Sequence, residues 1–117
     1  IDSFSYAGFD LAKSPISYCE RRYARNGAQF YFSGIPLEIA DYSVMSGTFN
    51  YAPDITFKAW KGYLFKSLNS IWNLTRRSMI FNLMISEKER ITSQSISYIE
   101  KETVVNFCQR NFKNWKY

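Results

Sequence analysis

The sequence predicts an α+β domain, with an antiparallel sheet of about four to six strands and a helix near each end. Three observations lead to this expectation. Short alternating or aromatic-rich segments recur between residues 28 and 99, and turn signals separate them. The last segment carries an apolar stripe with helical spacing. A length of 117 residues with 46% hydrophobic residues fits one domain with one core over residues 1–117.

The first helix is predicted by a start signal and a stop signal. Ser14 is expected as its N-cap with Pro15 in the first helical position, and the helix continues past Cys19. The Asn-Gly pair at 26–27 is a turn signal that ends it. Residues 1–13 show weak periodicity, so we expect an extended arm or a short strand there.

The strands are predicted from alternation and from aromatic or β-branched content. In chain order they cover residues 28–33, 37–42 with an extension or third strand over 42–51, 55–66, 77–87 and 91–99. Turns are expected at 34–36, 52–54 and the charged segment 87–90. Residues 67–75 fit a helical spacing, but the segment is too short for the pattern to decide.

The last helix is predicted by apolar residues that recur every three to four positions. The stripe contains Val104, Phe107, Cys108, Phe112 and Trp115. Its spacing turns Cys108 toward the core, where either a disulfide to the N-terminal segment or a buried free thiol is compatible with the pattern.

Cys19 and Cys108 are the two cysteines, and 88 residues lie between them. We expect one disulfide that ties the start of the domain to its end, worth roughly 4–5 kcal/mol in the chain-entropy model. Such a bond persists in an oxidising compartment and would place the domain in the periplasm or outside the cell. The alternative is two unrelated buried thiols in a cytosolic protein. Because the chain starts at Ile1, we expect that a signal peptide or membrane anchor was removed upstream.

The composition argues against catalysis and against a metal or cofactor site. The chain has no histidine, which removes the commonest general base and the commonest metal ligand. The carboxylates are scattered, and no phosphate-binding or dinucleotide-binding glycine motif is present. The net charge of +5 comes from dispersed residues, which favours a solvated basic surface over direct nucleic-acid binding. We therefore expect no enzyme, no cofactor and no metal.

Aromatic residues are unusually frequent, at 19% of the chain. They occur on both faces of the predicted strands, so both faces should be covered by a core, a ligand pocket or a partner, including a second copy of the chain. The Ser-rich strand 91–99 is our candidate edge for capture of a partner strand. The partner or pocket candidates are Phe30, Tyr31, Phe32, Trp60, Tyr63, Ile96 and Tyr98.

The segment from residue 76 to residue 112 resembles the C-terminal half of the FidL-like family, which includes the PsaF and MyfF accessory proteins of fimbrial expression. There an arginine opens a strand, a second strand follows, and a short helix containing Thr-Val ends in aromatic residues. The matching positions are Arg77, Phe81, Ile96, Thr103, Val104 and Phe112, and Cys19 fits an early cysteine of the family.

This resemblance implies the periplasmic domain of a small inner-membrane protein whose N-terminal span lies outside the sequence. The implied partner is a membrane-anchored, winged-helix transcription activator, in an arrangement similar to ToxR and ToxS. The accessory protein would bind and stabilise the activator and convey an environmental signal such as acidity. A secreted or periplasmic toxin-neutralising (immunity) protein and a lipocalin-like carrier of an apolar ligand are the alternatives.

Overall fold

The computed structural model describes residues 3–117 and divides the chain into two compact units. Unit 1 comprises Ile1–Glu38 and unit 2 comprises Ile39–Tyr117. Each unit is described here by itself, and the expectation of a single domain stays a prediction. Among the described residues, no helix combines the length and the apolar character that crossing a bilayer requires.

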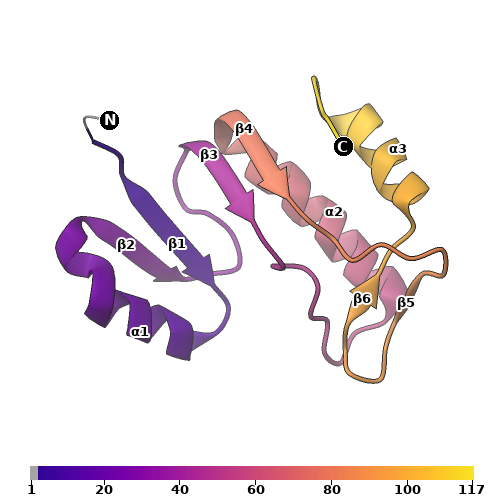
Figure 1. The fold of residues 1–117 in the computed structure, drawn as a ribbon, viewed down its shortest axis with the longest axis horizontal. Coiled ribbons are helices and arrows are strands. Elements are labelled where there is room, and N and C mark those ends of the chain that lie inside the picture. The colour runs from indigo at the N-terminus through magenta and orange to yellow at the C-terminus, as the bar shows by residue number, and fades with distance from the viewer. Residues whose placement is uncertain (1–2) are drawn as a thin grey trace. The chain divides into compact units, whose positions relative to one another are not determined.

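Unit 1 is a strand–helix–strand motif (Figure 1). Strand β1 (Tyr6–Asp10) leads into helix α1 (Lys13–Tyr23), a 3-10 turn η1 (Ala24–Asn26) and strand β2 (Ala28–Phe32). β1 and β2 run parallel, in a register that keeps their two carboxyl ends level. Helix α1 packs against both strands, as a parallel pair requires of its crossover.

The start of α1 lies before the predicted N-cap. Ala12 occupies the N-cap and makes no side-chain cap, and Pro15 is the third helical residue. Proline is accepted in this first turn because its missing N–H would have no intrahelical partner there. The predicted stop is confirmed, since Gly27 ends the following 3-10 turn in the left-handed region at φ 79°.

Unit 2 begins with a second strand–helix–strand motif. Strand β3 (Ala40–Met45) is connected through helix α2 (Phe57–Asn73) to strand β4 (Thr75–Phe81). β3 and β4 are parallel, with one register shift between Ala40 and Tyr42. In Figure 1, α2 lies along the sheet, and it packs against β4.

The rest of unit 2 is a short hairpin followed by the last helix. Strands β5 (Arg90–Ile91) and β6 (Ser97–Tyr98) are antiparallel, and helix α3 (Lys101–Asn111) follows. The prediction of one continuous strand over 91–99 is wrong, because a tight turn divides that segment. Its Ser95 has φ 63°, and the Ser95 N–H donates to the Thr92 carbonyl at 2.9 Å.

The predicted antiparallel sheet of four to six strands is not present in the described residues. They form three sheets of two strands each, of which two are parallel and one is antiparallel. The mixed α and β content is confirmed, and the strand at 28–33 and the C-terminal helix lie where the sequence predicts them. The predicted strand 77–87 ends at Phe81 and pairs with β3, so segment 87–90 is not a hairpin turn between neighbouring strands.

The predicted strand over 55–66 is also wrong, because these residues begin helix α2. Thr56 caps the helix, and its hydroxyl accepts from the Ala59 N–H at 3.2 Å. Trp60, Leu64 and Leu68 follow at intervals of four and are all buried. This helical period extends through 17 residues and outweighs the alternation of the six residues 55–60.

The core of unit 2 forms around α2. Leu64 and Leu68 are both 0% exposed. Helix α3 packs on α2 through Phe107, whose ring stacks on Phe65 with the centroids 4.0 Å apart. The other buried members of the cluster are Met45, Phe49, Ala52, Trp60, Ile71, Ile99, Cys108 and Phe112.

We expect Leu64→Ala to destabilise unit 2 by roughly 3–5 kcal/mol, since a fully buried leucine leaves a cavity when it is truncated. Lys66→Ala, on the exposed side of the same helix, should change the free energy of unfolding by less than about 0.5 kcal/mol. Urea unfolding followed by tryptophan fluorescence measures both values. Equal losses in the two variants would show that α2 does not bury this face.

Candidate functional site

A carboxylate lies where β1 ends and the chain turns into α1. Asp10 is the last residue of β1 and is exposed. Its Oδ1 accepts from the Ala12 N–H at 2.7 Å, and its carbonyl accepts from the Ser33 N–H at 3.0 Å. These contacts fix the turn and leave the second carboxylate oxygen without a hydrogen bond to any residue of 3–117.

The side chain of Asn82, directly after β4, forms hydrogen bonds to the loop that follows β3 in unit 2. Asn82 follows β4, and its Oδ1 accepts from the Gly47 N–H at 2.7 Å. Its Nδ2 donates to the Ser46 hydroxyl at 3.4 Å. Gly47 has φ 69°, a conformation that glycine adopts without strain. The loop after β3 is therefore held beside the end of β4.

Asn50, in the same loop, carries a buried acceptor without a partner. Its side-chain Oδ1 has no hydrogen bond within the described part of the chain. Its backbone is engaged, since its N–H donates to the Gly47 carbonyl and its carbonyl accepts from the Ser97 N–H. An unmatched buried acceptor costs free energy, so a donor supplied by water or a ligand would stabilise this loop.

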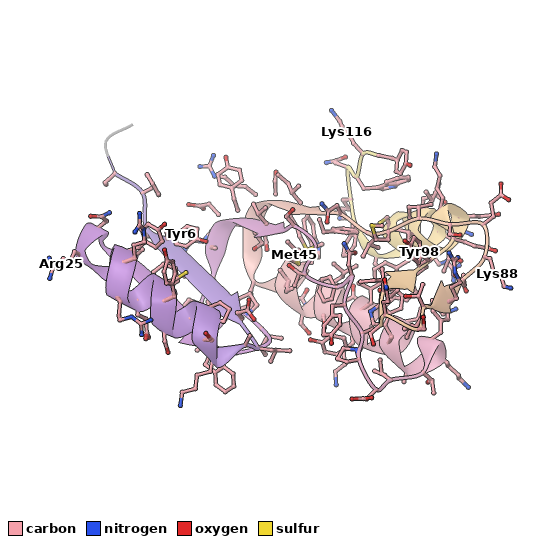
Figure 2. The ribbon with its side chains drawn as sticks, turned by 60° about the horizontal axis from the view of Figure 1, so that its bottom comes forward. Tyr6, Arg25, Met45, Lys88, Tyr98 and Lys116 are labelled. Atoms are coloured by element: carbon pink, nitrogen blue, oxygen red, sulfur yellow. The ribbon has the colours of Figure 1, made fainter. Side chains whose placement is uncertain are left out.

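An open groove of about 660 Å³ lies at the other end of unit 1. Tyr6 and Ala28, the first residues of the two strands, contribute to its wall, so it opens at their amino ends. Tyr6 is labelled in Figure 2. The remaining lining residues are Ser3, Phe4, Cys19, Tyr23, Asn26, Gly27 and Phe30. Its wall is largely apolar and aromatic.

Both cysteines are free thiols in the structure, so the predicted Cys19–Cys108 disulfide is not formed in it. Cys108 is buried in the core of unit 2, which matches the alternative of a buried free thiol. Burial raises the pKa of the Cys108 thiol and disfavours the reactive thiolate. Cys19 belongs to unit 1 and is only half-buried. Because each unit is described by itself, the disulfide stays a prediction.

The aromatic candidates of unit 1 have three different environments. Phe30 lines the groove. Tyr31 stacks on Phe9, with the ring centroids 5.1 Å apart. Phe32 is 63% exposed. Of these three residues, Phe30 is the one that lines this groove.

Trp60 and Tyr63 differ in the same way in unit 2. Trp60 is 2% exposed, and its Nε1 donates to the Phe49 carbonyl at 2.9 Å, so it is a core residue. Tyr63 is partly exposed and packs edge-on against the Phe49 ring.

Ile96 and Tyr98 do not form an exposed strand edge. Ile96 pairs with Tyr51 through an isolated antiparallel bridge. The guanidinium of Arg90 lies 4.5 Å from the centroid of the Tyr98 ring. Tyr98 is labelled in Figure 2. Both Ile96 and Tyr98 are half-buried. Because Ile96 already pairs with Tyr51, this edge does not offer a free backbone to a partner strand.

The polar groups at the strand ends were not among the residues predicted from the sequence. The signal for Asp10 is an acidic residue three positions before the first helical residue, Lys13. The signal for the loop after β3 is Ser-Gly-Thr directly after a strand. Neither signal indicates a binding site unless the strands are known to be parallel, because only then do both carboxyl ends lie at the same end of the sheet. Among residues 3–117, no three His, Cys, Asp or Glu side chains gather as metal ligands do.

No protein-family model, curated protein or solved structure matches this chain. The resemblance to the FidL-like family therefore stays a prediction.

We expect the two thiols to react at different rates in the folded, unreduced protein. Cys19 should react with a thiol-specific reagent at least about tenfold faster than Cys108, whose burial excludes the reagent and suppresses the thiolate. Labelling followed by peptide mass analysis measures the two rates, and both thiols should react after denaturation. If the denatured, unreduced protein contains no reactive thiol, the disulfide forms and the free-thiol arrangement is wrong.

Proposed function

We propose that this chain binds a nucleoside, with the ribose hydroxyls on the carboxylate of Asp10. The observation that carries the proposal is the parallel pairing within each strand–helix–strand motif. Open parallel sheets bind their ligands at the carboxyl ends of the strands, where loops converge. Asp10 stands at such an end in unit 1.

The position of Asp10 suits a ribose diol. In nucleotide-binding sheets an acidic residue about 20 residues after the first strand–helix turn accepts a hydrogen bond from a ribose hydroxyl. Asp10 ends the first strand instead, so the likeness lies in the residue type and in its place at the carboxyl end of a strand. One oxygen of Asp10 is held by the Ala12 N–H at 2.7 Å, which orients the carboxylate. A carboxylate accepts hydrogen bonds from hydroxyl donors and repels a phosphate. The sugar is therefore the part of the ligand that we assign to this residue.

Unit 2 repeats the parallel strand–helix–strand arrangement, and its strand ends are considered by themselves. The loop after β3 contains the unmatched acceptor of Asn50, which we assign to a bound water or to a ligand of unit 2 itself. Asn82 holds that loop in place through Gly47. The large groove of unit 1 lies at the amino ends of its strands, so we give it less weight than the strand ends despite its size.

Asp10→Asn should weaken adenosine binding by about 10- to 150-fold, because a hydrogen bond to a charged acceptor is worth roughly 1.5–3 kcal/mol. Asparagine keeps an oxygen for the Ala12 N–H, so the turn should remain intact. An NMR titration of the labelled protein with adenosine, following the Ala12 amide, gives the dissociation constants.

Glu20→Gln, which changes an exposed acid of helix α1, serves as the matched protein control and should bind adenosine normally. The ligand control is 2′,3′-dideoxyadenosine, whose binding should not distinguish Asp10→Asn from the native chain. The proposal is wrong if the native protein does not bind adenosine, or if Asp10→Asn binds it equally well.

An accessory function is the second candidate, and the exposed apolar side chains of unit 1 favour it. Leu11 and Phe32 are mostly exposed and lie at the carboxyl ends of β1 and β2, where Asp10 pairs with Phe32. Exposed apolar residues that lie together often mark a protein-binding surface. On this proposal the chain is a periplasmic domain that binds and stabilises a membrane-anchored, winged-helix activator without catalysis.

The accessory proposal predicts a shorter lifetime of the activator in cells that lack this protein. A pulse-chase experiment in cells with and without the gene measures that lifetime, and a Phe32→Ser variant should resemble the deletion. An activator that is equally stable and equally active in both strains would reject this candidate and leave toxin neutralisation as the next one to test.

A further inference from the structure

The β3–β4 sheet has one covered face and one open face. On the covered side, Met45 is buried and Met79 packs against the core. On the opposite side, Tyr42, Val44 and Ile80 are 61%, 68% and 58% exposed. Tyr42 pairs with Ser78 and Val44 with Ile80, so these four residues form one surface, which we call the outer face.

The composition of the outer face is unusual for a surface in contact with water. A half-solvated antiparallel sheet alternates apolar and polar residues, whereas parallel strands are normally apolar on both sides because helices cover both faces. Here the outward positions carry Tyr42, Val44 and Ile80, and helix α2 packs against the sheet from the other side. Three of these five outward side chains, counted with Arg76 and Ser78, are therefore large and apolar, as on a face that another element covers.

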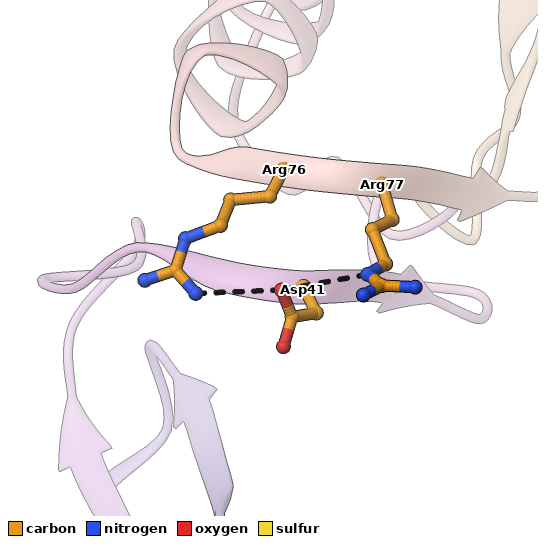
Figure 3. Close-up of polar contacts among 3 residues, drawn as sticks. All are labelled: Asp41, Arg76 and Arg77. Atoms are coloured by element: carbon orange, nitrogen blue, oxygen red, sulfur yellow. Dashed lines mark hydrogen bonds and ion pairs between the residues drawn. The ribbon is translucent and has the colours of Figure 1, made fainter.

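The outer face has a positive charge at its edge (Figure 3). The carboxylate of Asp41 lies between two guanidinium groups, 3.4 Å from Nη1 of Arg76 and 3.8 Å from Nε of Arg77. One carboxylate balances only one of these cations. Arg76 alternates with Ser78 and Ile80 along β4, whereas Arg77 alternates with Met79 and reaches the edge of the outer face only through its contact with Asp41. By sequence, unit 2 has eleven basic and six acidic residues, so it carries the entire net charge of +5.

We propose that the outer face docks an amphipathic α-helix that places an acidic side chain beside Arg76 and Arg77. Residues two apart on a strand are separated by about 6.7 Å, and paired strands by about 4.8 Å. Side chains one turn apart on a helix are separated by about 5.4 Å, which lies between these two spacings.

Charge and topology select this occupant over the others. Crossovers between parallel strands place helices on the faces of the sheet, so a helix is the element that this geometry accepts. A second copy of the chain would bring another positively charged unit 2 to the same face, where like charges repel. An acidic helix would instead use the unbalanced cation of Arg76 and Arg77.

The test uses two synthetic helical peptides of about 16 residues with an identical leucine stripe. One peptide carries Glu on the positions beside the stripe and the other carries Lys. Fluorescence anisotropy of each labelled peptide with the full chain gives the affinities. We expect the Glu peptide to bind at least about tenfold more tightly than the Lys peptide.

Two variants locate the binding and its charge preference. Val44→Thr combined with Ile80→Thr keeps β-branched residues on both strands and should weaken the Glu peptide by at least about tenfold. Arg76→Gln combined with Arg77→Gln should reduce the difference between the two peptides to about twofold or less. Ile55→Thr, at an exposed apolar residue outside the outer face, is the matched control and should bind as the native chain does.

Three outcomes would overturn the proposal. The native chain could bind neither peptide, or the threonine variant could bind as tightly as the native chain. In the third outcome, sedimentation shows that the native chain self-associates and the threonine variant does not, which makes a second copy the occupant. A measurement on the native protein makes the test independent of whether the variants fold. The Glu peptide should change the amide chemical shifts of Tyr42, Val44 and Ile80.

Discussion

The packing of helix α2 on the β3–β4 sheet is the interaction on which unit 2 depends. Leu64 and Leu68 are fully buried, and each buried leucine contributes roughly 1.5–3 kcal/mol. A helix of 17 residues spans roughly 25 Å, enough to return the chain to the start of β3. β4 therefore begins beside Ala40 and runs parallel to β3. The same geometry brings the polar groups that follow both strands to one edge of the sheet.

The sequence predicts local elements better than their pairing. Helices α1 and α3 and strand β2 have signals within their own residues, namely a turn at 26–27, an apolar stripe and an aromatic alternation. The direction of a strand has no such signal, because alternation is the same in parallel and antiparallel sheets. The error at 55–66 has a related cause. Residues 55–60 alternate as a strand does, but the helical period is longer and continues through residues 67–73, where a short window does not reveal it.

Sequence reasoning found unusual residues more readily than it found a site. Trp60 was conspicuous as a large aromatic, yet it is a core residue with its N–H bonded to a backbone carbonyl. Cys108 was correctly placed on the buried stripe of the last helix. Asp10 and Asn82 are common residue types, and only the parallel arrangement of the strands makes their positions informative. Their roles could not be predicted without the pairing.

The direction of the β3–β4 pair is the central claim, because the polar loop that Asn82 holds after β3 and the outer face both depend on it. Nuclear Overhauser contacts between backbone protons of the two strands measure this direction. For parallel strands the account predicts contacts between Tyr42 and Ser78 and between Val44 and Ile80, so that the residue number increases in the same direction on both strands. Contacts in which one number rises while the other falls would establish an antiparallel pair and contradict the account.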